Sequence, residues 1–80
     1  MNIEHLATLA ISDSGFIFDP CTGDTYNTNE IGLKIIQWIK KGKDFNELMD
    51  LLIAHYDVTE EELEADLLDF IQTLKYYHMV

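Results

Sequence analysis

Residues 11–24 read Ile11-Ser12-Asp13-Ser14-Gly15-Phe16-Ile17-Phe18-Asp19-Pro20-Cys21-Thr22-Gly23-Asp24. Turn-forming residues separate short apolar runs in this segment, at positions where backbone geometry requires them. Pro20 presets φ for the second position of a type I turn, and Gly23 can adopt the left-handed conformation that closes a hairpin loop. The segment therefore predicts a short antiparallel β-meander.

Three strands are expected in this part of the chain. Residues 6–11 predict the first strand and residues 15–19 the second, with residues 12–15 forming the reverse turn between them. Phe16 and Phe18 should point to one face of the sheet. Residues 24–28 predict a third strand, which is more polar and is therefore expected at the edge of the sheet.

From Asn29 onward the apolar residues recur at helical spacing. The first helix is expected over residues 30–41, with Asn29 as its N-cap and Gly42 ending it. Asp44 and Thr59 should begin the second and third helices, since each is followed three residues later by a glutamate in the capping-box pattern. The expected apolar stripes are Ile31, Ile35, Trp38 and Ile39; Phe45, Leu48, Met49, Leu52 and Tyr56; and Leu63, Leu67, Phe70, Ile71 and Leu74.

The length of 80 residues predicts a single domain over residues 1–80. A chain of this size buries only about 60% of the surface that its unfolded form exposes, so the core needs most of the large apolar residues and leaves little for an enclosed active site. The expected class is α+β, with an N-terminal three-stranded antiparallel sheet followed by three helices. The core should centre on four residues, Trp38, Leu52, Leu67 and Phe70.

Charge excludes one broad class of partner. Fifteen acidic residues against five lysines and no arginine give a net charge of −10. Nucleic-acid binding depends on lysine and arginine, so no nucleic-acid partner is expected. The apolar runs are far shorter than the roughly 20 residues of a membrane span, and no secretory leader is visible. We therefore expect an acidic cytoplasmic protein with no membrane association.

Candidate catalytic and metal-binding residues are sparse. The lone Cys21 excludes an internal disulfide and is interpreted as a free turn thiol. Ser12 and Ser14 have no nearby histidine to act as a base. The histidines stand in different predicted elements without partners at helical spacing, which favours an ordinary surface or boundary role over metal ligation; they are His5, His55 and His78. The sequence predicts no enzyme, no metal site and no cofactor.

Several of these short motifs occur together in a familiar order. They are residues 12–23, then Asn29-Glu30-Ile31-Gly32, then a helix ending at Gly42, and finally a Tyr56-Asp57-Val58 step into an acidic last helix. The set resembles the PQQ-biosynthesis protein D (PqqD) family over most of the chain. Members of that family are small peptide chaperones, also called RiPP recognition elements, with a winged helix-turn-helix-like fold.

The resemblance implies a binding role. Such a domain holds the leader segment of a ribosomally made precursor peptide and presents it to a modifying enzyme, often a radical-SAM enzyme. In the family the leader adds as a strand to the edge of the third strand and lies against the third helix. Carried over by position, the peptide-binding residues are Thr25, Tyr26, Asn27 and Thr28 on the strand, and Glu64, Leu68, Ile71 and Lys75 on the helix.

Leu68 is the key residue of the helix side. At about 100° per residue it lies roughly 100° from the centre of the third apolar stripe, so the core does not explain it. Either Leu68 contacts the peptide, or it packs against another helix of the same domain. The sequence therefore does not determine which flank of the third helix faces the peptide.

Two other functions compete with leader binding. A general protein-interaction or scaffold module, which binds a folded partner and no leader, is the stronger alternative. A DNA-reading winged helix is opposed by the acidic third helix, on which Lys75 is the only basic residue. Cys21 also occupies a turn position where family members frequently carry a basic residue, so charge-based docking contacts of the family do not transfer simply.

Overall fold

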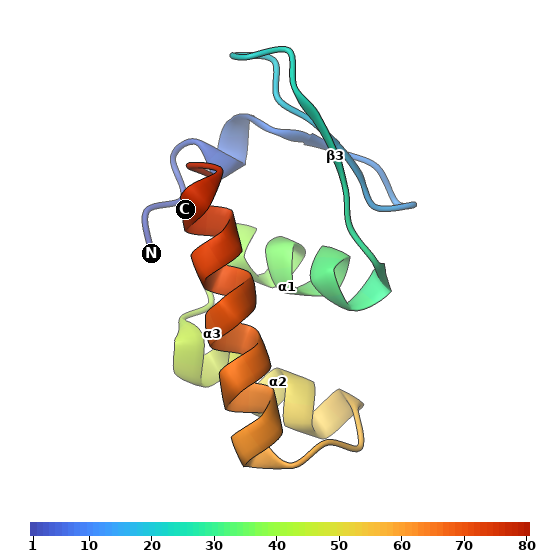
Figure 1. The fold of residues 1–80 in the computed structure, drawn as a ribbon, viewed down its shortest axis with the longest axis vertical. Helices are drawn as coiled ribbons and strands as arrows, with labels where there is room; N and C mark the ends of the chain where they lie inside the picture. Colours follow the sequence, from blue (N-terminus) through green and yellow to red (C-terminus); the bar gives the residue numbers. More distant parts are fainter.

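The computed structural model describes residues 1–80 as a small sheet followed by three helices (Figure 1). This confirms the predicted α+β class and the antiparallel sheet. In chain order the elements are the 3-10 helix η1 (Leu6–Thr8), β1 (Ala10–Ile11), β2 (Phe16–Phe18), β3 (Thr25–Asn27), α1 (Glu30–Lys40), α2 (Phe45–His55) and α3 (Glu60–Tyr76).

The first strand is shorter than predicted. Residues 6–8 form η1 instead, and the strand contains only Ala10–Ile11. Leu6 and Leu9 are both buried, at 0% and 4% exposure. A 3-10 turn places residues three apart on the same side, whereas a strand would send them to opposite faces. Burial of both leucines therefore favours the turn.

The sheet has the order β1-β2-β3 with both pairs antiparallel. Ile17 of β2 stands opposite Tyr26 of β3 on the face turned toward the core, and Ile17 is 2% exposed. Phe16 and Phe18 share the other face, as predicted, and they are 43% and 39% exposed. One face of the sheet is thus covered by the helices, while the other carries two exposed aromatic rings.

The contact between Gly15 and Thr28 closes the sheet at the end where the chain leaves for α1. The amide of Thr28 donates to the Gly15 carbonyl oxygen over 2.8 Å. Gly15 has φ +89°, and a Cβ there would collide with the backbone oxygen of Thr28. Gly23, in the next turn, has φ +80° with open space around it. The positive φ favours glycine at both positions, but only at position 15 would a Cβ also collide with a neighbouring atom.

The helix caps agree with the sequence patterns. The side chain of Asn29 accepts from the Gly32 amide over 2.8 Å, and Asp44 and Glu47 form a reciprocal capping box at α2. At α3 only half of the predicted box is present, because Thr59 accepts from the Glu62 amide and no reciprocal bond forms. α1 ends one residue earlier than expected.

Thirteen buried residues form the core cluster. Leu52 and Leu67 lie at its centre with 1% exposure each, as predicted, whereas Trp38 and Phe70 are only partly buried against it. The predicted stripe of α1 is also shifted, since Ile31 is 43% exposed and Ile36 is buried in its place. The aromatic residues therefore lie at the boundary of the core, where they can line a surface hollow.

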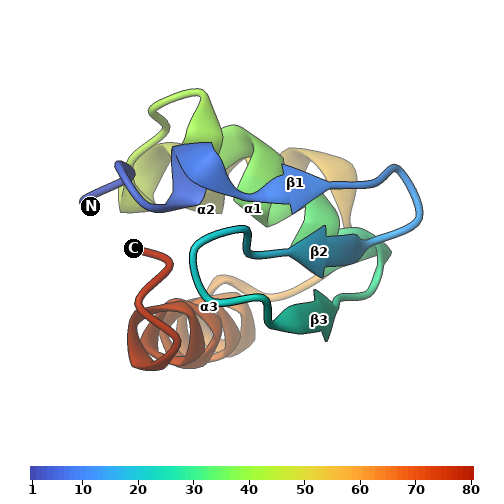
Figure 2. The same ribbon diagram turned by 90° about the horizontal axis from the view of Figure 1, so that it is seen from above.

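α3 extends from beside α2 to the end of the sheet near η1, and both termini lie on the same side of the molecule (Figures 1 and 2). Seen from above, β3 is the strand on the side of α3 (Figure 2). The rings of Tyr26 on β3 and Tyr77 just after α3 contact each other, with centroids 5.1 Å apart. None of the helices has the length and apolar character that a membrane span requires.

A contact between two polar side chains joins the N-terminal segment to the β2–β3 loop. His5 Nε2 lies 2.8 Å from Asp19 Oδ2, and Asp19 is 3% exposed. Burial alone would raise the pKa of Asp19, but the hydrogen bond from the Cys21 amide and the contact with His5 outweigh it and hold this pKa below 3.8. With 31% of its side chain exposed, His5 lies at the boundary of the domain, within the surface or boundary role that the sequence predicted, and its partner there is Asp19.

We expect Gly15→Ala to lower the free energy of unfolding by about 2–4 kcal/mol. Left-handed backbone costs a residue with a Cβ about 1 kcal/mol, and displacing the Thr28 backbone adds about 1–3 kcal/mol. Gly23→Ala is the matched control and should lose only about 1 kcal/mol, because its Cβ meets nothing. Urea unfolding measures both, and equal losses would contradict a close approach at Gly15.

Asp19→Asn should destabilise the protein at neutral pH, and the difference from wild type should shrink as the solution is acidified. A carboxylate whose pKa is lower in the folded state contributes stability above its unfolded pKa, and the contribution disappears as pH falls through the folded value. The stability difference between Asp19→Asn and wild type should therefore begin to shrink near pH 3.8 and continue to shrink below it. Urea unfolding at pH 7, 4 and 3 checks this, and a difference that stays constant over the series would refute it.

Candidate functional site

β3 is an edge strand, and some of its backbone N–H and C=O groups have no hydrogen-bond partner. Asp24 accepts a hydrogen bond from Asp19, and Thr28 donates one to Gly15, so these even-numbered residues face β2. Bonding and non-bonding positions alternate along an antiparallel strand, which turns the backbone N–H and C=O groups of Thr25 and Asn27 to the open edge. No hydrogen bond outside the ladder uses them. The edge can therefore accept a further strand.

A hollow of about 200 Å³ lies between this edge and α3. Its walls come from the inner face of the sheet and the residue after β3, from Ile36 of α1, from the last turns of α3 and from the residues that follow. Seven of its ten lining residues are hydrophobic, which makes it a place for an apolar side chain. The lining residues are Ile17, Tyr26, Asn27, Thr28, Ile36, Phe70, Thr73, Leu74, Tyr77 and Met79.

A larger hollow of about 490 Å³ continues from the first along α3. The two share Asn27, Thr28 and Phe70, so we treat them together as the β3–α3 groove. The larger hollow is bounded by the start of α1, the end of α2 and the first half of α3. Its remaining lining residues are Asn29, Ile31, Gly32, Ile35, Leu52, Tyr56, Val58, Leu63, Asp66 and Leu67.

Gly32 determines how closely α3 approaches α1 at the middle of the groove. A Cβ at Gly32 would lie 3.3 Å from Phe70 Cε1 and would also meet the Thr28 side chain. The ring of Phe70 therefore rests against bare backbone of α1, between the two hollows. The exposed side chains of Ile31 and Val58, at 43% and 41%, line the larger hollow rather than the core.

The strand half of the predicted site lies in the groove. Tyr26, Asn27 and Thr28 line it, and Thr25 presents its backbone at the open edge. Burial raises the pKa of Tyr26, and the carboxylates of Asp24 and Asp19 raise it further. Its phenol consequently stays protonated in the neutral range and can donate a hydrogen bond.

The helix half of the predicted site lies elsewhere. None of the four residues Glu64, Leu68, Ile71 and Lys75 lines either hollow. Ile71 is buried in the core at 7% exposure, while Leu68 is 48% exposed and does not pack inside the domain. Leu68 is two residues from Phe70, about 200° around the helix, so the two side chains leave α3 on opposite sides.

The residues of α3 that face the groove form their own helical stripe. It contains Leu63, Asp66, Leu67, Phe70, Thr73, Leu74 and, just beyond the helix, Tyr77. The sequence pattern places the apolar members of this stripe in the core and leaves Leu68 outside it. Thr73 and Tyr77, which also line the smaller hollow, extend the Phe70 row at spacings of three and four with residues less apolar than a core needs, and this spacing is the sequence signal for the face of α3 that lines the groove.

Comparison with known families bears on this arrangement. A family model for coenzyme PQQ synthesis protein D (PqqD) matches residues 15–80. The chain belongs to the PqqD family. The matched region begins at β2 and thus contains both walls of the groove. Searches among curated proteins and among solved structures found no match.

Membership in the PqqD family supports a role related to PQQ biosynthesis. The family is one of non-catalytic accessory domains, and it binds peptide and partner enzymes. An open strand edge beside an apolar groove is consistent with a binding domain of this kind.

Substitution of adjacent leucines checks the orientation of α3. Leu68→Asp should change the free energy of unfolding by no more than about 0.5 kcal/mol, because the side chain is exposed. Leu67→Asp, one residue earlier, should cost several kcal/mol, since it places a carboxylate in the core. Urea unfolding monitored by circular dichroism distinguishes them, and similar losses for both would mean that α3 is rotated from the orientation described.

Proposed function

We propose that this PqqD-family protein is a peptide chaperone that binds the leader segment of a ribosomally made precursor peptide and presents it to a modifying enzyme. The observation that carries the proposal is the pairing of free backbone groups on β3 with an apolar groove directly beside them. The protein itself performs no chemistry in this proposal, and a radical-SAM enzyme is one suitable partner.

Strand addition explains how the two features would work together. An added strand satisfies the N–H and C=O groups of Thr25 and Asn27, and these main-chain bonds supply affinity without regard to sequence. Alternate side chains of the added strand point to opposite faces, so every second side chain turns toward α3. Apolar residues at alternate leader positions would then enter the groove, and its two hollows would supply selectivity.

The helix half of the contact falls on Phe70, Thr73 and Tyr77 in this proposal. These three lie across the groove from β3, where Tyr77 already contacts Tyr26. Aromatic rings of this kind give large contact area with little loss of side-chain freedom. Glu64, Leu68 and Lys75 are exposed outside the groove, and the proposal does not require them.

Charge should influence which leader is held. Asp66 is the acidic residue in the groove lining, and the chain as a whole carries −10. An acidic domain attracts a peptide with lysine or arginine beside its apolar positions, and the attraction weakens as salt screens it. We therefore expect leader affinity to decrease as the salt concentration rises.

Thr25→Pro is the sharpest test of strand addition. Proline removes the outward N–H of residue 25 and leaves the bonds to β2 intact, because residues 24, 26 and 28 form those. Affinity for a leader encoded beside this gene should fall about tenfold, since one hydrogen bond is lost and the proline ring obstructs the edge. Isothermal titration with the synthetic leader measures the loss.

Leu68→Asp serves as the control for the same titration and should keep wild-type affinity. Amide chemical shifts should change in residues 25–28 and around Phe70, Thr73 and Tyr77. Wild-type binding by Thr25→Pro would argue against strand addition, and shifts confined to Leu68 and its neighbours would return the helix half of the site to the residues predicted from sequence.

A general protein-interaction module is the second candidate, and the outer face of the sheet favours it. Phe16 and Phe18 stand side by side there with 43% and 39% of their surface exposed. A folded partner docking on this face would be sensitive to Phe18→Ser and insensitive to Thr25→Pro. The neighbouring genes also separate the two candidates, because only the chaperone requires a short precursor peptide and a modifying enzyme.

A further inference from the structure

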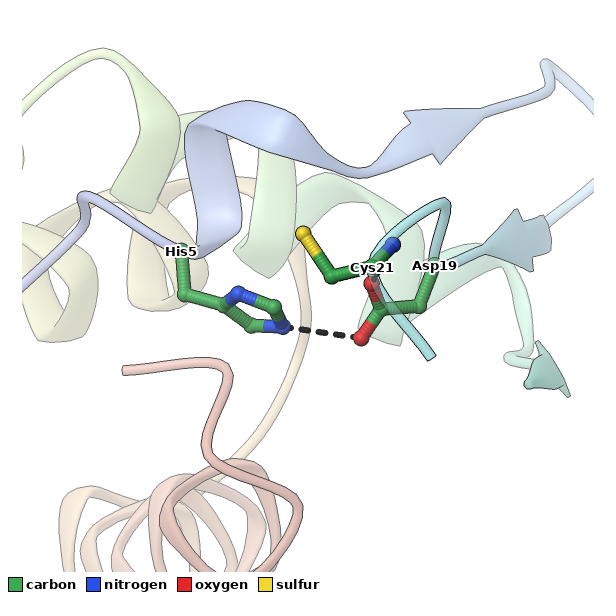
Figure 3. A group of neighbouring side chains, drawn as sticks. All are labelled: His5, Asp19 and Cys21. Carbon is green, nitrogen blue, oxygen red and sulfur yellow. Dashed lines mark hydrogen bonds and ion pairs between the residues drawn. The ribbon is translucent and has the colours of Figure 1, made fainter. Parts of the chain in front are cut away.

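Three potential metal ligands from distant parts of the sequence converge at the end of the sheet away from Gly15. His5 directly precedes η1, Asp19 follows β2, and Cys21 lies in the β2–β3 loop (Figure 3). Their ligand atoms all lie within 4.8 Å of one another. No other group of histidine, cysteine and acidic side chains in the chain meets in this way. The spacing of these residues carries no metal signature, so only the fold reveals the cluster.

The cluster is held in place by its surroundings. Asp19 is buried, and its backbone bonds Asp24 and Gly23 across the loop over 2.9 and 2.8 Å. The Cys21 amide donates to Asp19 Oδ1 over 2.9 Å, which fixes the loop around the carboxylate. His5 is held next to Leu6, which is fully buried. The side chains that would bind a metal are thus already gathered in the free protein.

We propose that His5, Asp19 and Cys21 form a binding site for a borderline divalent cation of the zinc type. Imidazole nitrogen, carboxylate oxygen and thiolate sulfur are the donors that zinc takes in proteins, whereas magnesium and calcium require oxygen donors throughout. Three protein ligands leave the fourth tetrahedral position for water. Cys21 is exposed, so an ion can enter from solvent.

The distances need only small adjustments. Bonds of about 2.0–2.3 Å place the ligand atoms of a tetrahedral zinc about 3.3–3.8 Å apart. His5 and Asp19, now 2.8 Å apart, would open slightly, and the Cys21 sulfur would move inward. The cation takes the place of the hydrogen bond between His5 and Asp19, and it displaces the proton of the Cys21 thiol to solvent.

An occupied site would tie the N-terminal segment to the hairpin that carries β3. Because the cation binds the folded chain, it should raise the unfolding temperature, and the rise should increase with the logarithm of the free zinc concentration once the site is largely filled. This inference rests on the cluster alone and is independent of leader binding.

Titration of the full chain with zinc chloride, in a reductant that contains no thiol, tests the site. We expect one equivalent to bind and the unfolding temperature to rise. Cobalt chloride should give a thiolate-to-cobalt charge-transfer band together with the visible bands of tetrahedral cobalt. His5→Ala and Cys21→Ser should each weaken binding at least about tenfold, because even partners outside the coordination sphere contribute about 10–100-fold.

His55→Ala is the matched control, since His55 is an exposed histidine on α2 whose Nδ1 bonds the Leu51 carbonyl oxygen. It should bind zinc as the wild type does. Asp19→Asn should also weaken binding, and circular dichroism shows whether it remains folded; if it unfolds, the other two variants decide the result. Wild-type affinity in Cys21→Ser, a cobalt spectrum without the thiolate band, or an equal loss in His55→Ala would overturn the proposal.

Discussion

The close approach of Gly15 to Thr28 is the constraint from which the rest of the arrangement follows. Thr28 ends the pairing of β3 with β2, and the next residue, Asn29, already caps α1. The sheet therefore has no linker between its last ladder bond and the first helix, and the direction of α1 is determined by the strand that precedes it. A side chain at position 15 would push Thr28 away and move the start of α1 with it.

A sheet of such short strands cannot cover the helices, and the groove is the consequence. β3 contains only Thr25–Asn27, while α3 extends over 17 residues. The part of α3 that extends past the sheet borders the apolar β3–α3 groove. Phe70 divides this groove into its two hollows, at the point where Gly32 has no side chain and the ring can approach α1 closely. Natural sheets usually protect an edge strand with charge or a covering segment. Here the edge of β3 lies open beside the β3–α3 groove, so a bound strand would extend the sheet over the groove.

Local signals predicted the order of elements, the turn at Gly23 and the cap at Asn29, because each depends on a few neighbouring residues. The failures all required knowledge of what packs where. The apolar run over residues 6–8 predicts a strand, but such a run does not distinguish a strand from a turn whose residues three apart are both buried. On α3, periodicity separated Leu68 from the stripe but could not show which edge of that stripe meets β3. The grouping of His5 with Cys21 arises only from the antiparallel return of the chain.

In the proposed binding mode, recognition of the leader divides between two kinds of contact. The edge of β3 offers hydrogen bonds that any peptide except one with proline at the bonding positions can satisfy, so it contributes affinity that hardly depends on sequence. The hollows of about 200 and 490 Å³ differ in size and lie at different distances along α3, and they can discriminate the side chains that alternate along an added strand. In this mode the acidic surface favours basic leaders in general, and with no arginine in the chain to bind carboxylates in bidentate fashion, the choice among such leaders depends on shape. Under the proposed function, selectivity should therefore follow the size and spacing of apolar residues in the peptide, and the row formed by Phe70, Thr73 and Tyr77 would be the matching surface on this domain.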